Sequence, residues 1–383
     1  MMSLFLLTFF LIYGGTHLYF FHKVNAAVSP GVIPGFCLAL FLLLMVVAPL
    51  LVRVLERQGL EAPARLTAYA GYLWMGFLFL FFSTSLALDI YHLLLQAAGF
   101  LSHRDFDGFF LSKRTALVLP LAWGMATALY GYFEALNIRT ERLVIETSKI
   151  PQAVGKVTIV QVSDVHLGLI VRQERLKRTI DEVKAASPDI LVSTGDLVDG
   201  QINRMTGLAE LLDDIKPRYG KYAVTGNHEI YAGIKQALAF TEKAGFKVLR
   251  GESVVAGGLI NIAGIDDPVN ERISHESPVS EKALLEGLPH EKFTLFLKHR
   301  PAIEQGSLGL FDLQLSGHVH KGQIFPFNLL THLFYPVRAG YSMYPRNSAL
   351  YVSRGTGTWG PPIRFLAPPE VTVIELRHAE KGP

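Results

Sequence analysis

Residues that could bind a metal follow short apolar runs in the second half of the chain. After "LQLS", His318 and His320 stand one residue apart. Side chains at positions i and i+2 of a strand point to the same face, so a continuing strand would turn both imidazoles into one space. Histidine is the commonest metal ligand but has many other uses. The pair alone therefore leaves a metal site, a catalytic pair and a chance arrangement open.

Four other apolar runs end in the same kind of residue. They deliver Asp164 and His166, then Asp196, then Asn227 with His228, and later His299. Loops at the carboxyl ends of strands are where α/β folds place their sites. We therefore expect five separate segments to bring these side chains to one edge of the fold.

Each motif alone is common, because Asp-x-His and Asn-His also occur in turns and caps. Their combination is informative. One ion seldom takes seven mixed protein ligands, whereas two ions that share a carboxylate fit such a set. Two metals close together can activate a hydroxide and clamp a phosphoryl group. The candidate ligands are Asp164, His166, Asp196, Asn227, His299, His318 and His320.

Alternating strands and helices are expected to position these residues. The segment 172–186 has Leu176, Ile180 and Val183 at helical spacing, and 208–215 also indicates a helix. Early strands alternate with helices and later segments are mostly strands, which is typical of a mixed α/β domain. The aromatic, Pro-broken segment 325–348 is interpreted as a long loop. Strands are expected at 156–164, 188–196, 221–229, 258–266, 292–299, 311–318, 349–357 and 370–376.

The first third of the chain has the composition of membrane helices. Hydrophobic residues make up 50% of the 383 residues and charged residues 18%, and a spanning helix needs about 20 apolar residues. We expect residues 1–135 to form a transmembrane region, 136–154 a linker and 155–378 a catalytic domain. The four predicted spans are 2–21, 32–52, 66–88 and 115–133.

The charged residues set expectations for membrane sidedness and for binding partners. Four spans would leave both chain ends on one side, and Lys and Arg near the spans favour the cytoplasm for that side. Asp89 and Glu134 lie near predicted span ends, where they can reach the interface. A net charge of +3 without a long basic run argues against nucleic acid. Because Cys37 is the single cysteine, an intrachain disulfide and a cysteine-based zinc site are excluded.

The blocks "DVHLG", "GDLVDG", "TGNHEIY", "LKHRP" and "SGHVHKGQ" resemble the calcineurin-like metallophosphoesterases. The resemblance covers nearly all of 155–378, and the final "YVSRGTGTWGPPIRFLAPPEVTVIEL" is similar to the membrane-associated YkuE/YaeI-like branch. It implies a two-sheet β-sandwich flanked by helices, following an N-terminal α-helical transmembrane bundle. It also implies two divalent ions, such as Mn, Fe or Zn.

The resemblance also implies a role for each residue. Asp196 would bridge the metals, and His228 would contact the phosphoryl oxygen or protonate the leaving group. Where the branch commonly has Gly-Gly, this chain has Lys321-Gly322, and we expect the lysine to face solvent. Asp164, His166 and His320 would hold the first metal, and Asn227, His299 and His318 the second.

The expected function is that of a membrane-bound phosphohydrolase. Its substrate would be a phosphodiester or pyrophosphate of an amphiphile, such as the UDP-2,3-diacylglucosamine that some relatives of this branch cleave. One alternative is a general phosphodiesterase or phosphoprotein phosphatase whose helices only anchor it. Another is a non-catalytic membrane sensor, although loss of catalysis would have relaxed so complete a ligand set.

Overall fold

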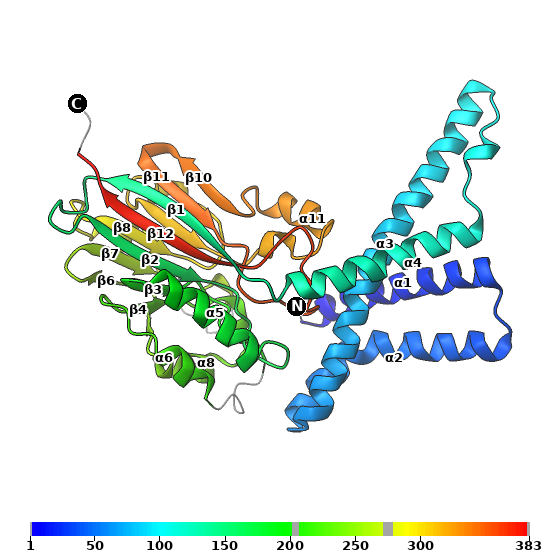
Figure 1. Ribbon diagram of the computed structural model, residues 1–383, viewed down its shortest axis with the longest axis horizontal. Helices are drawn as coiled ribbons and strands as arrows, with labels where there is room; N and C mark the ends of the chain where they lie inside the picture. Colours follow the sequence, from blue (N-terminus) through cyan, green and yellow to red (C-terminus); the bar gives the residue numbers. More distant parts are fainter. Residues whose placement is uncertain (1, 201–206, 271–278, 381–383) are drawn as a thin grey trace. The chain divides into compact units, whose positions relative to one another are not determined.

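The computed structural model describes residues 2–200, 207–270 and 279–380 (Figure 1). The expected range 155–378 therefore includes two segments, 201–206 and 271–278, that lie outside the described residues. The chain divides into two compact units. The first is Met1–Phe133 with Gly360–Ile363, and the second is Glu134–Trp359 with Arg364–Pro383.

The first unit is helical. Three stretches, Val32–Arg57, Glu61–Ser102 and Asp107–Glu134, are long and apolar enough to cross a membrane, and they contain the predicted spans 32–52, 66–88 and 115–133. The predicted span 2–21 lies in the first helix, whose first side chains lie outside the described residues, so this span stays a prediction. The helices are α1 (Met2–Val28), α2 (Val32–Arg57), α3 (Glu61–Ser102) and α4 (Lys113–Glu134), with a 3₁₀ turn at Asp107–Phe109.

Polar side chains join α1 to α3 within this unit. Asp89 on α3 pairs with Lys23 on α1 and accepts a hydrogen bond of 2.6 Å from the Tyr19 hydroxyl. The indole of Trp74 donates to His17 at 2.9 Å. Ionisable groups on membrane helices usually pair in this way. Asp89 therefore links α3 to α1, a role that its position near a predicted span end did not reveal.

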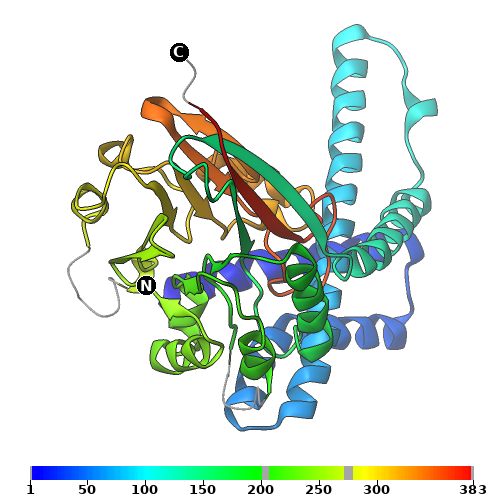
Figure 2. The same cartoon turned by 60° about the vertical axis from the view of Figure 1, so that its left-hand side comes forward.

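The second unit contains two six-stranded sheets (Figure 2). One has the order β1-β12-β2-β3-β4-β5 and the other β10-β11-β9-β8-β7-β6. The first sheet comprises β1 (Arg139–Thr147), β2 (Lys156–Val162), β3 (Ile190–Ser193), β4 (Lys221–Ala223), β5 (Lys247–Val248) and β12 (Glu370–His378). The second comprises β6 (Glu252–Ala256), β7 (Ile260–Gly264), β8 (Phe293–Leu297), β9 (Leu313–Ser316), β10 (Gly340–Tyr344) and β11 (Ser348–Val352).

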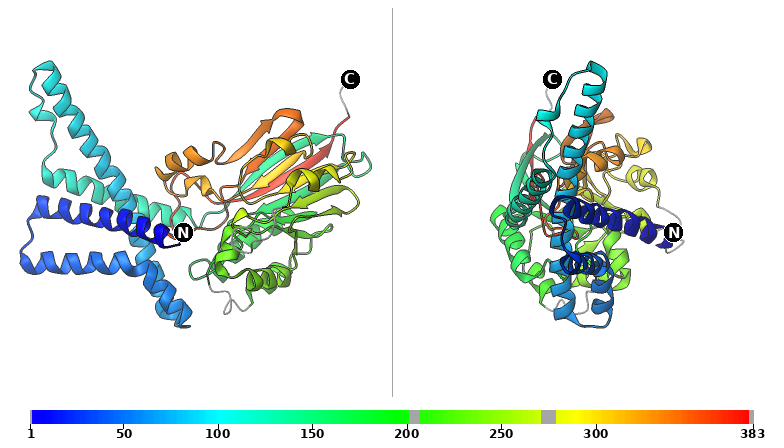
Figure 3. Two further views of the ribbon diagram at one scale, coloured as in Figure 1. Left: turned by 180° about the vertical axis from the view of Figure 1, so that it is seen from behind. Right: turned by 90° about the vertical axis from the view of Figure 1, so that its right-hand side faces the viewer.

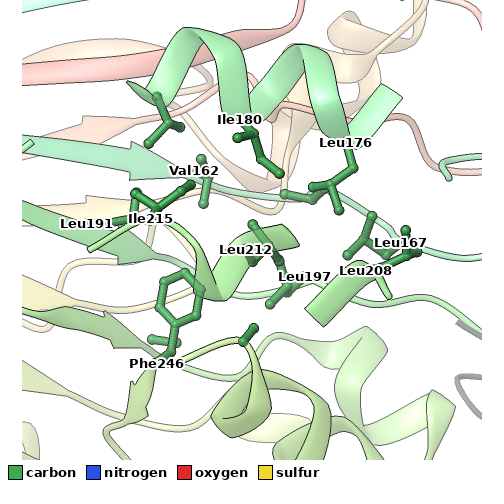
Figure 4. Packing of buried hydrophobic residues seen from close by; sticks show 14 of the residues in the cluster. Val162, Leu167, Leu176, Ile180, Leu191, Leu197, Leu208, Leu212, Ile215 and Phe246 are labelled. Atoms are coloured by element: carbon green, nitrogen blue, oxygen red, sulfur yellow. The ribbon is translucent and has the colours of Figure 1, made fainter. Parts of the chain in front are cut away.

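Helices cover the outer faces of these sheets. Strand β2 is buried on both faces, because Ile159 packs into the core between the sheets while Val162 packs on the helical side. That explains its nearly continuous apolar run. On the helical side, Leu176 and Ile180 pack towards Leu212 (Figure 4). The helices are α5 (Gln173–Ala186), α6 (Leu208–Asp213), α7 (Asn227–Ala232), α8 (Ile234–Lys243), α10 (Glu281–Glu286) and α11 (Phe327–Phe334).

Two expectations for the connecting segments are corrected. The range 136–154, expected to be a linker, contains β1, which pairs in parallel with β12 (Figure 2). Burial alternates along most of this edge strand, because Leu143 and Ile145 pack on the core while Val144 between them is exposed, and its polar first half resembles a connection. The segment 325–348 is not a loop, because it forms α11 and β10.

Candidate metal centre

The candidate residues lie in loops that follow parallel strands. Strands β2, β3 and β4 are parallel neighbours in the first sheet. Strands β8 and β9 are parallel neighbours in the second. The carboxyl ends of these strands therefore deliver their loops to one edge of each sheet, which is where an α/β fold builds a site.

Five of the seven predicted ligands have left-handed backbone conformations. Their φ angles are +52° at Asp164 and His166, +51° at Asp196, +73° at His318 and +47° at His320. Such angles are uncommon for residues with a Cβ and persist only where the surrounding structure enforces them. They turn each side chain out of the strand direction at the sheet edge. His318 and His320 therefore converge through turns, and the strand continuation that would have placed them on one face is wrong.

Close backbone approach explains two of the motif glycines. A Cβ on Gly317 would lie 2.2 Å from Oδ2 of Asp164, and a Cβ on Gly226 would lie 2.2 Å from Oδ1 of Asp196. The amide of His318 also donates to Oδ1 of Asp164 at 3.0 Å. The loops after β2 and β9 are thus held in direct contact, and a larger residue at Gly317 would separate them.

Three groups of side chains bring potential ligand atoms within 4.8 Å of one another. Oδ2 of Asp196 lies 3.2 Å from Nε2 of His299 and 3.8 Å from Nε2 of His166, so this carboxylate stands between the two halves of the site. The predicted division of His318 and His320 between two centres matches these groups. They are Asp164 with His166 and His320, Asp196 with His299 and His318, and His166 with Asp196 and His228.

The polar atoms that face this space fit a pair of cations. Nε2 of His166 lies 3.1 Å from Nε2 of His320, and Nδ1 of His318 lies 3.2 Å from Nε2 of His299. Ring nitrogens that face each other so closely can both direct lone pairs at a metal. Oδ1 of Asn227 is buried without a hydrogen-bond partner in the structure, although buried acceptors are nearly always paired. The nitrogen and oxygen donors suit borderline divalent ions.

Burial and charge set the protonation of these groups. Burial lowers the pKa of His166 and of His318 to about 3, which favours the neutral ring that binds metals. Burial alone would raise the pKa of Asp196, but His299 and His228 outweigh it and hold the pKa well below its usual range. Burial alone would lower the pKa of His299, but the negative charge of Asp196 outweighs burial and raises the pKa of His299 to about 10. Asp196 therefore stays ionised at neutral pH and attracts positive charge.

His228 faces the same space from the start of α7. Its Nδ1 lies 2.9 Å from Oδ1 of Asp199, and its ring stands edge-on to His166 at a centroid distance of 4.7 Å. Burial lowers the pKa of His228, but the carboxylates of Asp196 and Asp199 outweigh burial and raise it to about 9. At neutral pH this raised pKa favours the protonated ring, which is the form that the predicted acid role of His228 requires.

Glu229 was not singled out from the sequence, yet it braces the site. Its Oε1 accepts from the amides of Leu197 and Val198, and its Oε2 accepts from those of Asp196 and Gly226, at 2.7–3.2 Å. One buried carboxylate thus ties the loop after β3 to the loop after β4. The position of Glu229 directly after Asn227 and His228 was the feature of the sequence that could have indicated this role.

Replacing Glu229 with glutamine is expected to destabilise the domain by about 2–4 kcal/mol, because an amide NH₂ would face backbone N–H donors that lose their acceptor. The midpoint of urea denaturation measures this effect. The matched control is Glu242→Gln, which changes an exposed residue of α8 and should cost less than about 0.5 kcal/mol. Equal midpoints for the two variants would contradict the bracing role.

Arg364 stabilises the backbone and the histidine ring next to the site. It is fully buried, and its guanidinium donates to the carbonyl oxygens of Arg354 at 2.6 Å and Gly357 at 3.1 Å. Its Nη2 also lies 3.0 Å from Nδ1 of His320. The backbone of residues 354–357 and the ring of His320 therefore share one buried cation. Nothing in the sequence distinguished this arginine from others.

Aromatic rings form the rim of the site. The rings of Tyr231 and Trp359 lie 5.5 and 6.2 Å from that of His228, and the Tyr335 ring lies 5.5 Å from that of His318. Tyr231 and Trp359 are each about half exposed. These three rings therefore border the cluster of candidate ligands. Lys321 is half-exposed and directly follows the candidate ligand His320 in the sequence.

All seven predicted ligands and His228 thus converge on one edge of the second unit, and their roles as ligands and acid stay predictions. The residues 157–322 match the family model described as calcineurin-like phosphoesterase. An uncharacterized metallophosphoesterase of Aquifex aeolicus (strain VF5) is 38% identical over 250 residues, which are 65% of this chain and 95% of that protein.

Two further relatives are similar over comparable lengths. The uncharacterized metallophosphoesterase YkuE of Bacillus subtilis (strain 168) is 32% identical over 65% of this chain and 90% of its own length. A transmembrane protein with metallophosphoesterase domain from Danio rerio is 33% identical over 68% of this chain and 63% of its own length. These relatives and the His/Asp clusters identify a metal-dependent phosphoester hydrolase with a membrane-associated part. The chain belongs to the calcineurin-like metallophosphoesterase family, whose members use two divalent metals.

Proposed function

We propose that this chain is a membrane-bound phosphohydrolase that cleaves a phosphodiester or pyrophosphate of an amphiphile at a centre of two metals. The observation that carries this proposal is the set of three linked groups of side chains, in which Asp196 joins His299 and His318 in one group and His166 and His228 in another, and His166 joins Asp164 and His320 in the third. Bound there, two divalent ions would activate water and polarise a phosphoryl group.

The residues of the chain divide the remaining work. Asp164, His166 and His320 would hold one ion, Asn227, His299 and His318 would hold the other, and Asp196 would contribute to both. The left-handed loops fix these groups before substrate arrives, so little reorganisation is needed during the reaction. His228, kept protonated by Asp199, donates a proton to the leaving oxygen.

The first unit supports a multi-pass attachment. Its apolar helices and the transmembrane relative support the membrane location. With four spans, the second unit would lie on the same side as the N-terminus, and the Lys and Arg count favours the cytoplasm for that side. A lipid-linked phosphoester such as UDP-2,3-diacylglucosamine would be accessible there.

The proposal is tested by removing and restoring the metal. Chelation of the full chain in detergent is expected to abolish hydrolysis of bis-p-nitrophenyl phosphate, and Mn²⁺ or Zn²⁺ should restore it, because the centre cannot activate water without its ions. Release of p-nitrophenolate measures the rate. Activity that survives chelation and is unchanged by added metal would contradict a metal-dependent reaction.

The substrate is tested in the same preparation by comparing a nucleotide diester, bis-p-nitrophenyl phosphate and UDP-2,3-diacylglucosamine. A clear preference for the lipid-linked compound is expected. Equal or better turnover of water-soluble diesters would favour the anchored general phosphodiesterase instead.

A further inference from the structure

The helix α11 turns its apolar side chains to solvent. No residue of this eight-residue helix is buried. Leu329 and Leu330 are 59% and 53% exposed, and Leu333 and Phe334 are 75% and 77% exposed. In Figure 3 this orange helix lies outside the two sheets. A surface helix of a soluble domain buries such residues and exposes its polar ones.

Asn328 of α11 faces the domain instead, whereas the polar His332 is exposed. Oδ1 of Asn328 is buried, and a Cβ on Gly322 would lie 2.5 Å from the Asn328 backbone. The carbonyl oxygen of Asn328 accepts from Arg338 at 3.0 Å. The helix therefore packs on the turn at His320–Gly322 through Asn328, and its leucines point away from this contact.

The apolar surface continues beyond the helix. Phe325 and Phe327 are 39% and 40% exposed, and the neighbouring Trp359 is half exposed. Gln323 ties Trp359 to this region, because its side chain hydrogen-bonds both the backbone nitrogen and the carbonyl oxygen of Trp359. We call these exposed residues the apolar face: Phe325, Phe327, Leu329, Leu330, Leu333, Phe334 and Trp359. Contiguous apolar surfaces of this kind mark interaction sites.

The charged residues that flank the apolar face in the sequence have one sign. The chain contains no Asp or Glu from 313 to 369, a stretch that includes Lys321, Arg338 and Arg346. Leucine, phenylalanine and tryptophan flanked by lysine and arginine are typical of elements that lie in a membrane interface and bind anionic headgroups. A protein partner would require no such absence of acidic residues.

A lipid bilayer is an apolar surface that this chain would meet through its membrane-crossing stretches. The same chain carries three stretches able to cross a membrane, and α4 ends at Glu134 while β1 begins at Arg139. Only residues 135–138 separate the helical region from the first strand.

We infer that the apolar face inserts into the surface of a bilayer with anionic headgroups and opens the metal centre towards a lipid phosphoester held in that bilayer. Tyr335, at the end of α11, already contacts His318, so a headgroup beside α11 is next to the site. The substrate part of this inference rests on the proposed function, whereas the docking part does not.

Docking is tested with a fluorophore on the full chain in phosphatidylcholine vesicles that contain phosphatidylglycerol. In a Cys37→Ser background, a label is placed at Leu333→Cys or, as the control, at Val255→Cys on β6, the opposite edge of the second sheet from β10. Brominated acyl chains are expected to quench the label at 333 and spare that at 255, and aqueous iodide should do the reverse. Quenching of the 333 label by iodide, or protection from both quenchers by a second copy or another part of the chain, would overturn the docking.

The substrate part is tested by matched leaving groups. Leu329→Gln with Leu333→Gln is expected to lower hydrolysis of the p-nitrophenyl ester of phosphatidic acid in vesicles by at least about 10-fold, and to change that of soluble bis-p-nitrophenyl phosphate less than about 2-fold. The control is Val144→Gln with Val255→Gln, two exposed strand residues, which should change neither rate. Equal losses on both substrates would overturn the lipid-surface role. A wild type inactive on both would contradict the proposed function, while the quenching result would still decide the docking.

Discussion

Replacing Asp196 with asparagine is expected to lower turnover of bis-p-nitrophenyl phosphate by at least about 10²-fold, the scale of losing a charged group that stabilises the transition state. Oδ1 of Asp196 accepts from the amide of His228 at 2.8 Å, and Oδ2 faces His299 at 3.2 Å. An asparagine that keeps the first bond turns its NH₂ towards the position between the two clusters. That group is uncharged and cannot bind a metal, so both halves of the centre lose their shared ligand.

Two measurements separate this effect from misfolding. Metal content per chain should fall relative to the wild type, while the far-UV circular dichroism stays unchanged. The matched control is Asp181→Asn, which alters an exposed aspartate on α5 and should leave both metal content and rate as they are. Full metal content together with a wild-type rate in Asp196→Asn would remove Asp196 from the centre.

Replacing His228 with alanine is expected to slow cleavage of an alkyl phosphodiester by at least about 10²-fold, the usual effect of removing an acid catalyst. Cleavage of bis-p-nitrophenyl phosphate should be affected much less, because p-nitrophenolate leaves without a proton. Comparing kcat for the two esters therefore measures proton donation directly. His290→Ala, at an exposed histidine, is the control. Equal losses on both esters would assign His228 to the phosphoryl oxygen instead.

The pH dependence of kcat tests the partner of this acid. Asp199 is one of the carboxylates that raise the pKa of His228 to about 9 despite its burial. Asp199→Asn keeps a hydrogen-bond acceptor but removes the charge, so the imidazolium is less stable and its pKa falls. The acid form exists below that pKa, and the alkaline limb of the kcat profile for the alkyl ester should therefore move to lower pH. An unmoved limb would mean that Asp199 only orients the ring.

Most of the fold could be predicted because buried strands carry long apolar runs. Strands β2, β3, β8 and β9 lie within the segments expected for them, since each is buried on both faces. Strand β1 was missed because it is an edge strand that begins with four polar residues and has no buried apolar run. Helix α11 was missed because its segment is aromatic and broken by prolines, which favoured a loop.

The sequence by itself determined which side chains could do chemistry, since the motifs at the strand ends contain all seven predicted ligands and His228. The tertiary structure decided how they meet. His318 and His320 converge because left-handed turns redirect them, and no strand periodicity carries that information. Glu229 and Arg364 acquired their roles only there, because a buried carboxylate or guanidinium is defined by the backbone groups that folding brings to it. Whether an apolar segment is core or surface is likewise a matter of what packs against it, and at α11 the domain packs against Asn328.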